Sequence, residues 1–338
     1  MRWILALLLF SSTAALADYS AHPRAAELLQ KLHDEYGFTD AELDGVRAAL
    51  VSAEQVPKLI ETEQTAKEKT LTWDAYRKIH VFPANLDNGA KFLAEQRPWL
   101  ARAEAQYGVS PYVIAAILGV ETKYGRFTGN NRVLDALATQ GFDHPTRSAF
   151  FFGELTEYFV LCRERGFDPL ALKGSYAGAL GAAQFMPSNY RRLAVDFDGD
   201  GRVDLWSLPD AIGSIANYLT AYDGARAFQR GQPLAVPTSY SGEPHADWPL
   251  NAKVQTHRAG DFMRVGVRSG LPEATPVGIV QLLLAAAQPD DPPVPEYWLG
   301  LSNFYAVMSY NPRVYYAMAV SQLADALQHP AAAPAVTP

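Results

Sequence analysis

One glutamate stands near the end of a segment that is otherwise apolar. Ser110 and Pro111 are typical of a helix start, and Gly125 can end a helix, so the sequence predicts a helix over residues 111–124. Glu121 lies in its last turns, and the nine residues before it carry no charge. The face that carries Glu121 is therefore expected to be apolar.

A carboxyl group in such a place has a chemical use. Partial burial and the negative end of a helix both disfavour the ionised form, so we expect a raised pKa for Glu121. A raised pKa suits a general acid that works near neutral pH. The alternative is a helix-end glutamate that pairs with Lys123 or Arg126, or simply reaches water.

A second group of carboxylates occurs in "VDFDGDGRVDLW", residues 195–206. Asp196, Asp198, Asp200 and Gly201 fit the spacing D-x-[DN]-x-[DN]-G, which brings hard oxygen ligands together as Ca²⁺ requires. Loop position twelve is Ser207, where a bidentate glutamate usually stands. The alternative is an acidic, solvated turn without a metal. No histidine accompanies the loop, so a catalytic zinc-like site is not indicated.

A third stretch, "GSYAGALGAAQFMPSNY" over residues 174–190, is rich in glycine and small residues. Such a run lets the backbone approach a ligand closely. Ser175 and Gln184 are among its side chains that can donate and accept hydrogen bonds. The alternative is a flexible turn followed by a helix that starts at Pro187. A serine nucleophile is not indicated, because there is no G-x-S-x-G elbow.

The elements that must position these residues are mostly helical. The mature chain opens on apolar residues at helical spacing from Ala25 to Tyr36, followed by Gly37 as a stop. Similar periodicity predicts further helices over residues 88–107, 111–124, 148–165, 187–194, 208–223, 276–288 and 312–328. The sequence therefore predicts a mainly α fold.

Residues 230–275 depart from this pattern. Pro233, Pro237, Pro244 and Pro249 punctuate the segment, and the runs 252–256 and 262–267 alternate more like strands. We expect a small β-containing insertion there. After His329 the chain is rich in alanine and proline, which predicts a disordered tail over residues 330–338.

The first residues of the chain predict that the protein is exported. Arg2, an apolar run and the ending Ala15-Leu16-Ala17 have the form of a secretory signal over residues 1–17, cleaved after Ala17. The apolar run is shorter than the ~20 residues that span a bilayer, so we expect no stable membrane insertion.

Cys162 is the only cysteine, which excludes an internal disulfide, and we expect it to be buried on a helix. The formal charge is −7 without any Lys/Arg-rich run, so nothing indicates a nucleic-acid partner.

Taken together, four segments resemble the lytic murein transglycosylase B family, cell-wall enzymes with a lysozyme-like core. They are "GVETKYGRFTGNNRVLDALATQGFDHPTRSAFFFGEL", "GSYAGALGAAQFMPSNYRRLAVDFDGDGRVDLW", "DAIGSIANYL" and "GLSNFYAVMSYNPRVYYAMAV", in the family's order. The resemblance covers most of residues 30–325. It implies a lysozyme-like catalytic domain over residues 18–329, with additional helices, an EF-hand-like loop over 196–210 and the β-containing insertion. The family's membrane-bound members carry a lipidated cysteine after the signal; because that cysteine is missing, this chain resembles a soluble, periplasmic member.

The resemblance assigns roles to particular residues. Glu121 of "GVET" corresponds to the catalytic acid and base. Ser175, Gln184, Tyr310 and Asn311 correspond to residues that line the glycan cleft. The implied partner is the peptidoglycan glycan strand, and no organic cofactor is implied.

The implied reaction needs only one carboxylate, although glycosidases usually need two. Protonated Glu121 would protonate the glycosidic oxygen between N-acetylmuramic acid and N-acetylglucosamine. As a carboxylate it would then accept the proton of the muramic 6-hydroxyl, which closes a 1,6-anhydro ring. The alternatives are a hydrolytic muramidase, in which water attacks, and a peptidoglycan-binding scaffold without activity.

The resemblance also completes the metal loop. The family's loop is longer than the usual EF-hand, and Asp210 corresponds to its closing acid. We therefore expect structural Ca²⁺ bound by Asp196, Asp198, Asp200, the Arg202 carbonyl and Asp210.

Overall fold

The computed structural model describes residues 18–65, 70–288 and 291–330. The predicted signal segment 1–17 and all but the first residue of the predicted tail lie outside these ranges. The described residues fall into two compact units, each drawn from two segments with the bounds Met1–Gln64 and Asn130–Gly178 for the first, and Thr65–Gly129 and Ala179–Pro338 for the second. Within the described residues there are fourteen α-helices and two small sheets, which confirms the mainly α prediction. No helix in these ranges combines the length and apolarity needed to cross a bilayer.

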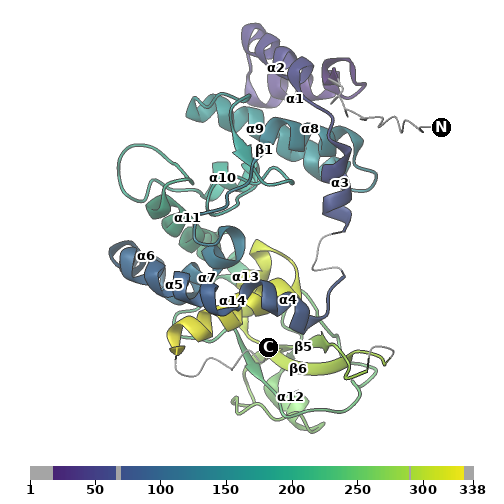
Figure 1. Cartoon of the computed structure of the whole chain (residues 1–338), viewed down its shortest axis with the longest axis vertical. Coiled ribbons are helices and arrows are strands. Elements are labelled where there is room, and N and C mark those ends of the chain that lie inside the picture. The colour runs from purple at the N-terminus through teal and green to yellow at the C-terminus, as the bar shows by residue number, and fades with distance from the viewer. Residues whose placement is uncertain (1–17, 66–69, 289–290, 331–338) are drawn as a thin grey trace, which may run out of the picture. The chain divides into compact units, whose positions relative to one another are not determined.

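The first unit is helical apart from one short strand pair (Figure 1). Its helices are α1 (Ala25–Tyr36), α2 (Asp40–Ser52), α3 (Pro57–Gln64), α8 (Val133–Asp143) and α9 (Ser148–Arg165). Helices α8 and α9 pack along each other, and α1 also contacts α9. Strands β1 (Asn131–Arg132) and β2 (Lys173–Gly174) pair antiparallel, and this pair precedes the glycine-rich stretch. The opening helix predicted from Ala25 to Tyr36 is confirmed by α1.

The second unit is built around a buried helix, α7 (Pro111–Thr122). The other helices of this unit are α4 (Trp73–His80), α5 (Pro83–Glu95), α6 (Arg97–Tyr107), α10 (Pro187–Leu193), α11 (Leu208–Ala221), α12 (Ala259–Met263), α13 (Ser302–Tyr310) and α14 (Val314–Gln328). Helices α5, α6, α11 and α14 all contact α7, and Figure 1 shows α7 next to α5 and α14. Because neighbours surround it, α7 can be apolar on nearly every side.

A four-stranded antiparallel sheet completes the second unit, in the order β3-β6-β5-β4. Its strands are β3 (Ala235–Pro237), β4 (His257–Arg258), β5 (Pro276–Leu284) and β6 (Val294–Gly300). The two long strands β5 and β6 form a hairpin in register from Gly278↔Gly300 to Leu284↔Val294. A small apolar core that includes Phe262, Ile279 and Leu299 lies between this sheet and α12.

The helix predicted over residues 276–288 is wrong, since the segment is strand β5. Val277, Ile279, Val280 and Leu282 are all buried, so side chains on both faces of the strand lie in apolar surroundings. The sequence of a strand that is buried on both faces is a continuous run of apolar residues, without alternation of apolar and polar positions. Periodicity therefore cannot distinguish such a strand from a buried helix. The sheet thus extends past the predicted insertion.

Two further predictions differ from the structure. The helix predicted over 88–107 is two helices, α5 and α6, which part at Gln96. Pro98 lies in the first turn of α6, and a proline lacks the amide hydrogen that would continue the preceding helix. The runs 252–256 and 262–267 contain no strand; Phe262 instead belongs to helix α12. The helices predicted over 111–124, 148–165, 187–194, 208–223 and 312–328 are confirmed within two residues at each end.

Candidate functional site

Glu121 is half-buried on the last turn of α7. Pro111 is the first helical residue as predicted, but the helix ends at Thr122 rather than at Gly125. Val113 to Val120 are all buried, so the apolar surroundings reach around the helix and are not confined to one face. The prediction of a carboxylate at the end of an apolar helix is confirmed.

A tyrosine from a distant part of the chain holds this carboxylate. The Tyr316 hydroxyl, on α14, donates a hydrogen bond of 2.6 Å to Glu121 Oε1. Burial raises the pKa of Tyr316 well above its usual range, and the negative charge of Glu121 adds to this. The hydroxyl therefore keeps its proton and acts as a donor.

The ring of Tyr310 stacks on that of Tyr316, with centroids 6.4 Å apart and planes 7° apart. Burial also raises the pKa of Tyr310 well above its usual range, and Glu121 contributes again. The Tyr310 hydroxyl donates to the Ala183 carbonyl of the glycine-rich stretch. Tyr310 thus connects the surroundings of Glu121 to that stretch.

The turn after Glu121 is fixed by a buried threonine. Thr122 Oγ1 donates to the Ala182 carbonyl at 2.9 Å and accepts the Gly125 amide at 2.9 Å. Lys123 follows in the left-handed region, with φ of 51°, and its Nζ donates to the Ile79 carbonyl at 3.3 Å. Burial lowers the pKa of Lys123, while the nearby charge of Glu121 opposes this shift.

Gln184 joins the glycine-rich stretch to the segment that follows Glu121. Its Nε2 donates to the Gly181 carbonyl at 2.9 Å and to the Thr128 carbonyl at 3.1 Å, so both amide hydrogens face the protein. What it can offer a sugar is its Oε1 acceptor. Gly181 has φ of 68°, and a Cβ there would lie 2.5 Å from the Leu205 carbonyl oxygen. The close backbone approach expected of this stretch is therefore made to the protein itself.

The remaining two predicted cleft residues are placed differently. Asn311 directly follows Tyr310 at the end of α13 and is half-buried, and its carbonyl accepts the Arg313 amide at 2.7 Å. Ser175 belongs to the first unit. Its Oγ accepts the Ala177 amide at 3.2 Å, inside a turn that follows β2. A position for Ser175 beside Glu121 stays a prediction.

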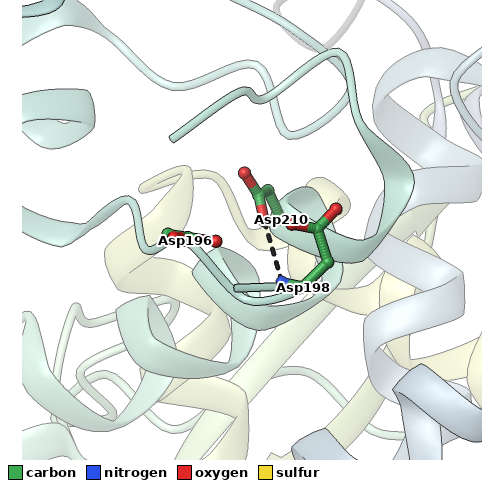
Figure 2. Close-up of side chains that lie close together, drawn as sticks. All are labelled: Asp196, Asp198 and Asp210. Atoms are coloured by element: carbon green, nitrogen blue, oxygen red, sulfur yellow. Dashed lines mark hydrogen bonds between the residues drawn. The ribbon is translucent and has the colours of Figure 1, made fainter. Parts of the chain in front are cut away.

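Three carboxylates of the acidic loop converge (Figure 2). Asp196, Asp198 and Asp210 each offer an oxygen within 4.8 Å of the other two. Asp210 comes from the first turn of α11 and is buried, whereas the other two are half-buried on the loop. The group does not include the carboxylate of Asp200, so the structure brings together three of the four predicted carboxylates.

Backbone amides shape the loop around these groups. Asp196 accepts the amides of Gly199, Asp200 and Gly201 at 2.7–3.1 Å. Gly199 and Gly201 have φ of 81° and 87°, values that favour glycine. The amide of Asp198 donates to Asp210 Oδ1 at 3.3 Å, as Figure 2 shows.

The donor set fits a hard cation. Carboxylate oxygens on a tight glycine-containing loop are the ligands that Ca²⁺ prefers. Burial raises the pKa of Asp210, against three backbone hydrogen bonds that lower it, and the charge of Asp198 raises it further. Like charges gathered in this way repel one another, and a divalent cation would remove that repulsion.

A cavity of about 610 Å³ lies elsewhere in the second unit. Ser110 and Tyr112 from the start of α7, Trp298 from β6 and Gln328 from the end of α14 contribute to its lining. None of the predicted site residues lines it, so it is separate from the surroundings of Glu121.

Tyr316 is a contact of Glu121 that sequence reasoning missed. It lies within the segment "GLSNFYAVMSYNPRVYYAMAV", but no local pattern distinguishes it from the tyrosine before it. A separation of 195 residues from Glu121 leaves no spacing signal. Only the packing of α14 against α7 reveals the pair.

Comparison with known proteins gives consistent results. The sequence model of the family "Transglycosylase SLT domain" matches residues 20–325. The membrane-bound lytic murein transglycosylase B of Escherichia coli (strain K12) is 36% identical over 327 residues, which cover 92% of this chain and 84% of that protein. The catenated lytic transglycosylase SltB1 from Pseudomonas aeruginosa has a similar structure, with a TM-score of 0.81, 36% identity and coverage of 93% and 99% of the two chains. The E. coli lytic transglycosylase SLT35, solved in complex with calcium, gives a TM-score of 0.78, 35% identity and coverage of 92% and 94%.

Proposed function

The chain belongs to the transglycosylase SLT family and is a lytic transglycosylase of peptidoglycan glycan strands, and from this premise we propose that Glu121 is its catalytic acid and base. The observation that carries the proposal is the carboxylate on the last turn of a buried helix, with one oxygen held by Tyr316 at 2.6 Å. Tyr316 acts through Glu121, as a positioning residue.

The first step breaks the bond between N-acetylmuramic acid and N-acetylglucosamine. Protonated Glu121 gives its proton to the glycosidic oxygen, and the leaving N-acetylglucosamine departs as the alcohol. The N-acetyl oxygen of the muramic residue supports the positive charge that develops at C1. This step requires Glu121 in its protonated form, as a general acid.

The second step closes the ring within the substrate. The muramic 6-hydroxyl attacks C1 and gives its proton to the Glu121 carboxylate, which restores the acid. Because both reacting atoms belong to one sugar, orientation can contribute ~7–11 kcal/mol of the barrier in ideal cases. The products are a 1,6-anhydromuramic end and a new N-acetylglucosamine end, so water is not consumed.

Four further residues are proposed to position the glycan. Gln184 offers Oε1 to a sugar amide or hydroxyl, since its Nε2 already binds two carbonyls. Tyr310 offers its ring, since its hydroxyl is bound to Ala183. Asn311 and Ser175 are proposed to bind the N-acetyl group and sugar hydroxyls; this role follows from their family motifs rather than from contacts.

The acidic loop is proposed to bind Ca²⁺ through Asp196, Asp198, Asp200, the Arg202 carbonyl and Asp210. The convergence of three carboxylates supports this, as does the calcium complex of SLT35. Asp200 would have to turn toward the group, and its exposed position on the loop permits this. A bound cation would fix the loop to the start of α11 and would take no part in proton transfer.

We also propose that the protein acts in the periplasm, with the signal segment removed after Ala17. Peptidoglycan lies outside the cytoplasmic membrane, so its cleavage requires export of the enzyme. The sequence over residues 1–17 supports this with a basic residue, an apolar run and a small-residue cleavage site.

The test is mass spectrometry of the soluble products released from purified sacculi. Three proteins are compared: the mature enzyme, Glu121→Gln, and Glu95→Gln as a matched control, because Glu95 is an exposed glutamate at the end of α5. We expect anhydro-muropeptides from the mature enzyme and from the control only. Reducing-end muropeptides would show that water attacks, and products from Glu121→Gln would remove Glu121 from its role.

A further inference from the structure

We propose that Phe127 is a glycan-binding residue, whose ring stacks against a sugar of the strand that Glu121 cleaves. This inference rests on the proposed function of Glu121 and adds a substrate contact to it. Phe127 is 71% exposed, the highest value among the large hydrophobic side chains of the described residues. An exposed aromatic ring on a rigid support is a common way to bind a flat apolar surface.

The position of Phe127 follows from the turn that ends α7. Its amide donates to the Thr122 carbonyl at 3.0 Å, and Thr122 is the residue after Glu121. From standard bond lengths, the Cα atoms of Phe127 and Glu121 lie within roughly 11 Å of each other. The two residues are therefore close enough together for one glycan strand to pass both.

The turn is held in an unusual conformation. Lys123 and Tyr124 have φ of 51° and 62°, and Gly125 follows with 83°, so three consecutive residues are left-handed. Two of these are not glycine, and such strain persists only where the surrounding structure enforces it. Strain of this kind is concentrated at functional sites, and here it brings the chain sharply off the helix toward Phe127.

Buried anchors make the turn rigid. The Tyr124 hydroxyl donates to the Asn85 carbonyl at 3.0 Å, and the residue is 6% exposed and lies beside Gly119 and Gly89. On the other side, Gln184 Nε2 holds the Thr128 carbonyl. Phe127 thus stands between two fixed points, and its backbone loses little freedom when a ligand binds.

Phe150 is also exposed, but side chains of the protein itself contact its ring. It is 45% exposed, but the Arg147 guanidinium lies 4.8 Å from its ring centroid and the Phe151 ring lies 5.1 Å away. In the part of the chain that the structure describes, no aromatic or cationic side chain covers the ring of Phe127 in this way. The apolar C–H face of a pyranose ring is a partner of suitable size and shape.

The experiment compares kcat and KM on N-acetylglucosamine–N-acetylmuramic acid oligomers for the mature enzyme, Phe127→Ala, Phe127→Tyr and Phe150→Ala. We expect Phe127→Ala to lower kcat/KM on the order of tenfold, mainly through KM, with an unchanged melting temperature. Phe127→Tyr should restore the value, and Phe150→Ala should match the mature enzyme. An unchanged kcat/KM in Phe127→Ala, or a loss that Phe127→Tyr fails to restore, would overturn the proposal.

A binding measurement distinguishes the role proposed for Phe127 from the role proposed for Glu121. Calorimetry with the same oligomers compares Glu121→Gln with Glu121→Gln/Phe127→Ala. Weaker binding by the double variant supports a stacking role even if the mature enzyme shows no turnover. Equal affinities of the two variants would reject the role of Phe127 and leave that of Glu121 intact.

Discussion

Asp210 allows a graded test of the acidic loop, because its two oxygens have different partners. Oδ1 accepts the amides of Phe197 at 2.7 Å and Asp198 at 3.3 Å, and Oδ2 accepts the amide of Asp204 at 2.8 Å. Asp210→Asn keeps one acceptor oxygen, which can retain the first two bonds. Asp210→Ala loses all three.

The expected losses of folding stability follow from the number of hydrogen bonds that each substitution removes. A buried amide without a partner costs about 1–3 kcal/mol. Asp210→Asn leaves only the amide of Asp204 without its partner. Because water can reach that half-buried amide, the free energy of unfolding should fall by about 0.5–1.5 kcal/mol. Asp210→Ala should lower it by about 2–6 kcal/mol, which is about 1–3 kcal/mol for the buried amide of Phe197 and about 0.5–1.5 kcal/mol for each half-buried amide of Asp198 and Asp204.

The assay is urea unfolding in EGTA and again in excess CaCl₂, with Asp87→Asn as a control for an exposed aspartate on α5. A site at 100 times its Kd of calcium gains about 2.7 kcal/mol of stability. The mature protein and Asp87→Asn should show this gain, and both Asp210 variants should lose most of it.

Two results would refute the reasoning separately. If both Asp210 variants matched the mature protein in EGTA, the three amide hydrogen bonds would not stabilise the loop. If Asp210→Asn kept the full calcium effect, or if EGTA and CaCl₂ gave the same unfolding curve for the mature protein, Asp210 would not be a calcium ligand.

Three further outcomes are expected. Tyr316→Phe removes the hydroxyl that holds Glu121 but keeps the ring, so kcat should fall about tenfold or more while KM stays the same; an unchanged kcat would remove Tyr316 from its positioning role. Thr122→Val deletes a buried hydroxyl bound to the Ala182 carbonyl, and the free energy of unfolding in urea should fall by about 2–4 kcal/mol. A loss below the measurement error would show that this contact does not stabilise the turn. Burial raises the pKa of the Cys162 thiol to about 12, so at pH 8 it is protonated, and iodoacetamide should label it only after unfolding; rapid labelling of the native protein would contradict this.

Local chemistry made much of the fold predictable. Pro111 and the uncharged run before Glu121 identify α7 because a buried helix needs a defined start and few polar side chains. The helix predicted over residues 276–288 is wrong because both faces of strand β5 are buried, which removes the alternation on which strand prediction depends.

The candidate site likewise contains residues that the sequence can indicate and contacts that exist only in the folded chain. Glu121 and the aspartates of the loop could be found because their chemistry is local or follows a fixed spacing. Tyr316 could not, since it acts on Glu121 across 195 residues and its role exists only in the folded chain. The conformation of Gln184, with φ of 52° and an amide turned toward the protein, also has no signature in the sequence.

The separation between Glu121 and Tyr316 also sets an order of events in time. Each compact unit is assembled from two segments, and α14, which supplies Tyr316, is the last described helix of the chain. At a synthesis rate of about 5–20 residues per second, roughly 10–40 s pass between the addition of the two residues. During that interval α7 lacks the helix that covers its apolar surface. Until α14 has been added, Glu121 lacks the hydroxyl that holds it, and a chain released before α14 would be left with an exposed, aggregation-prone core.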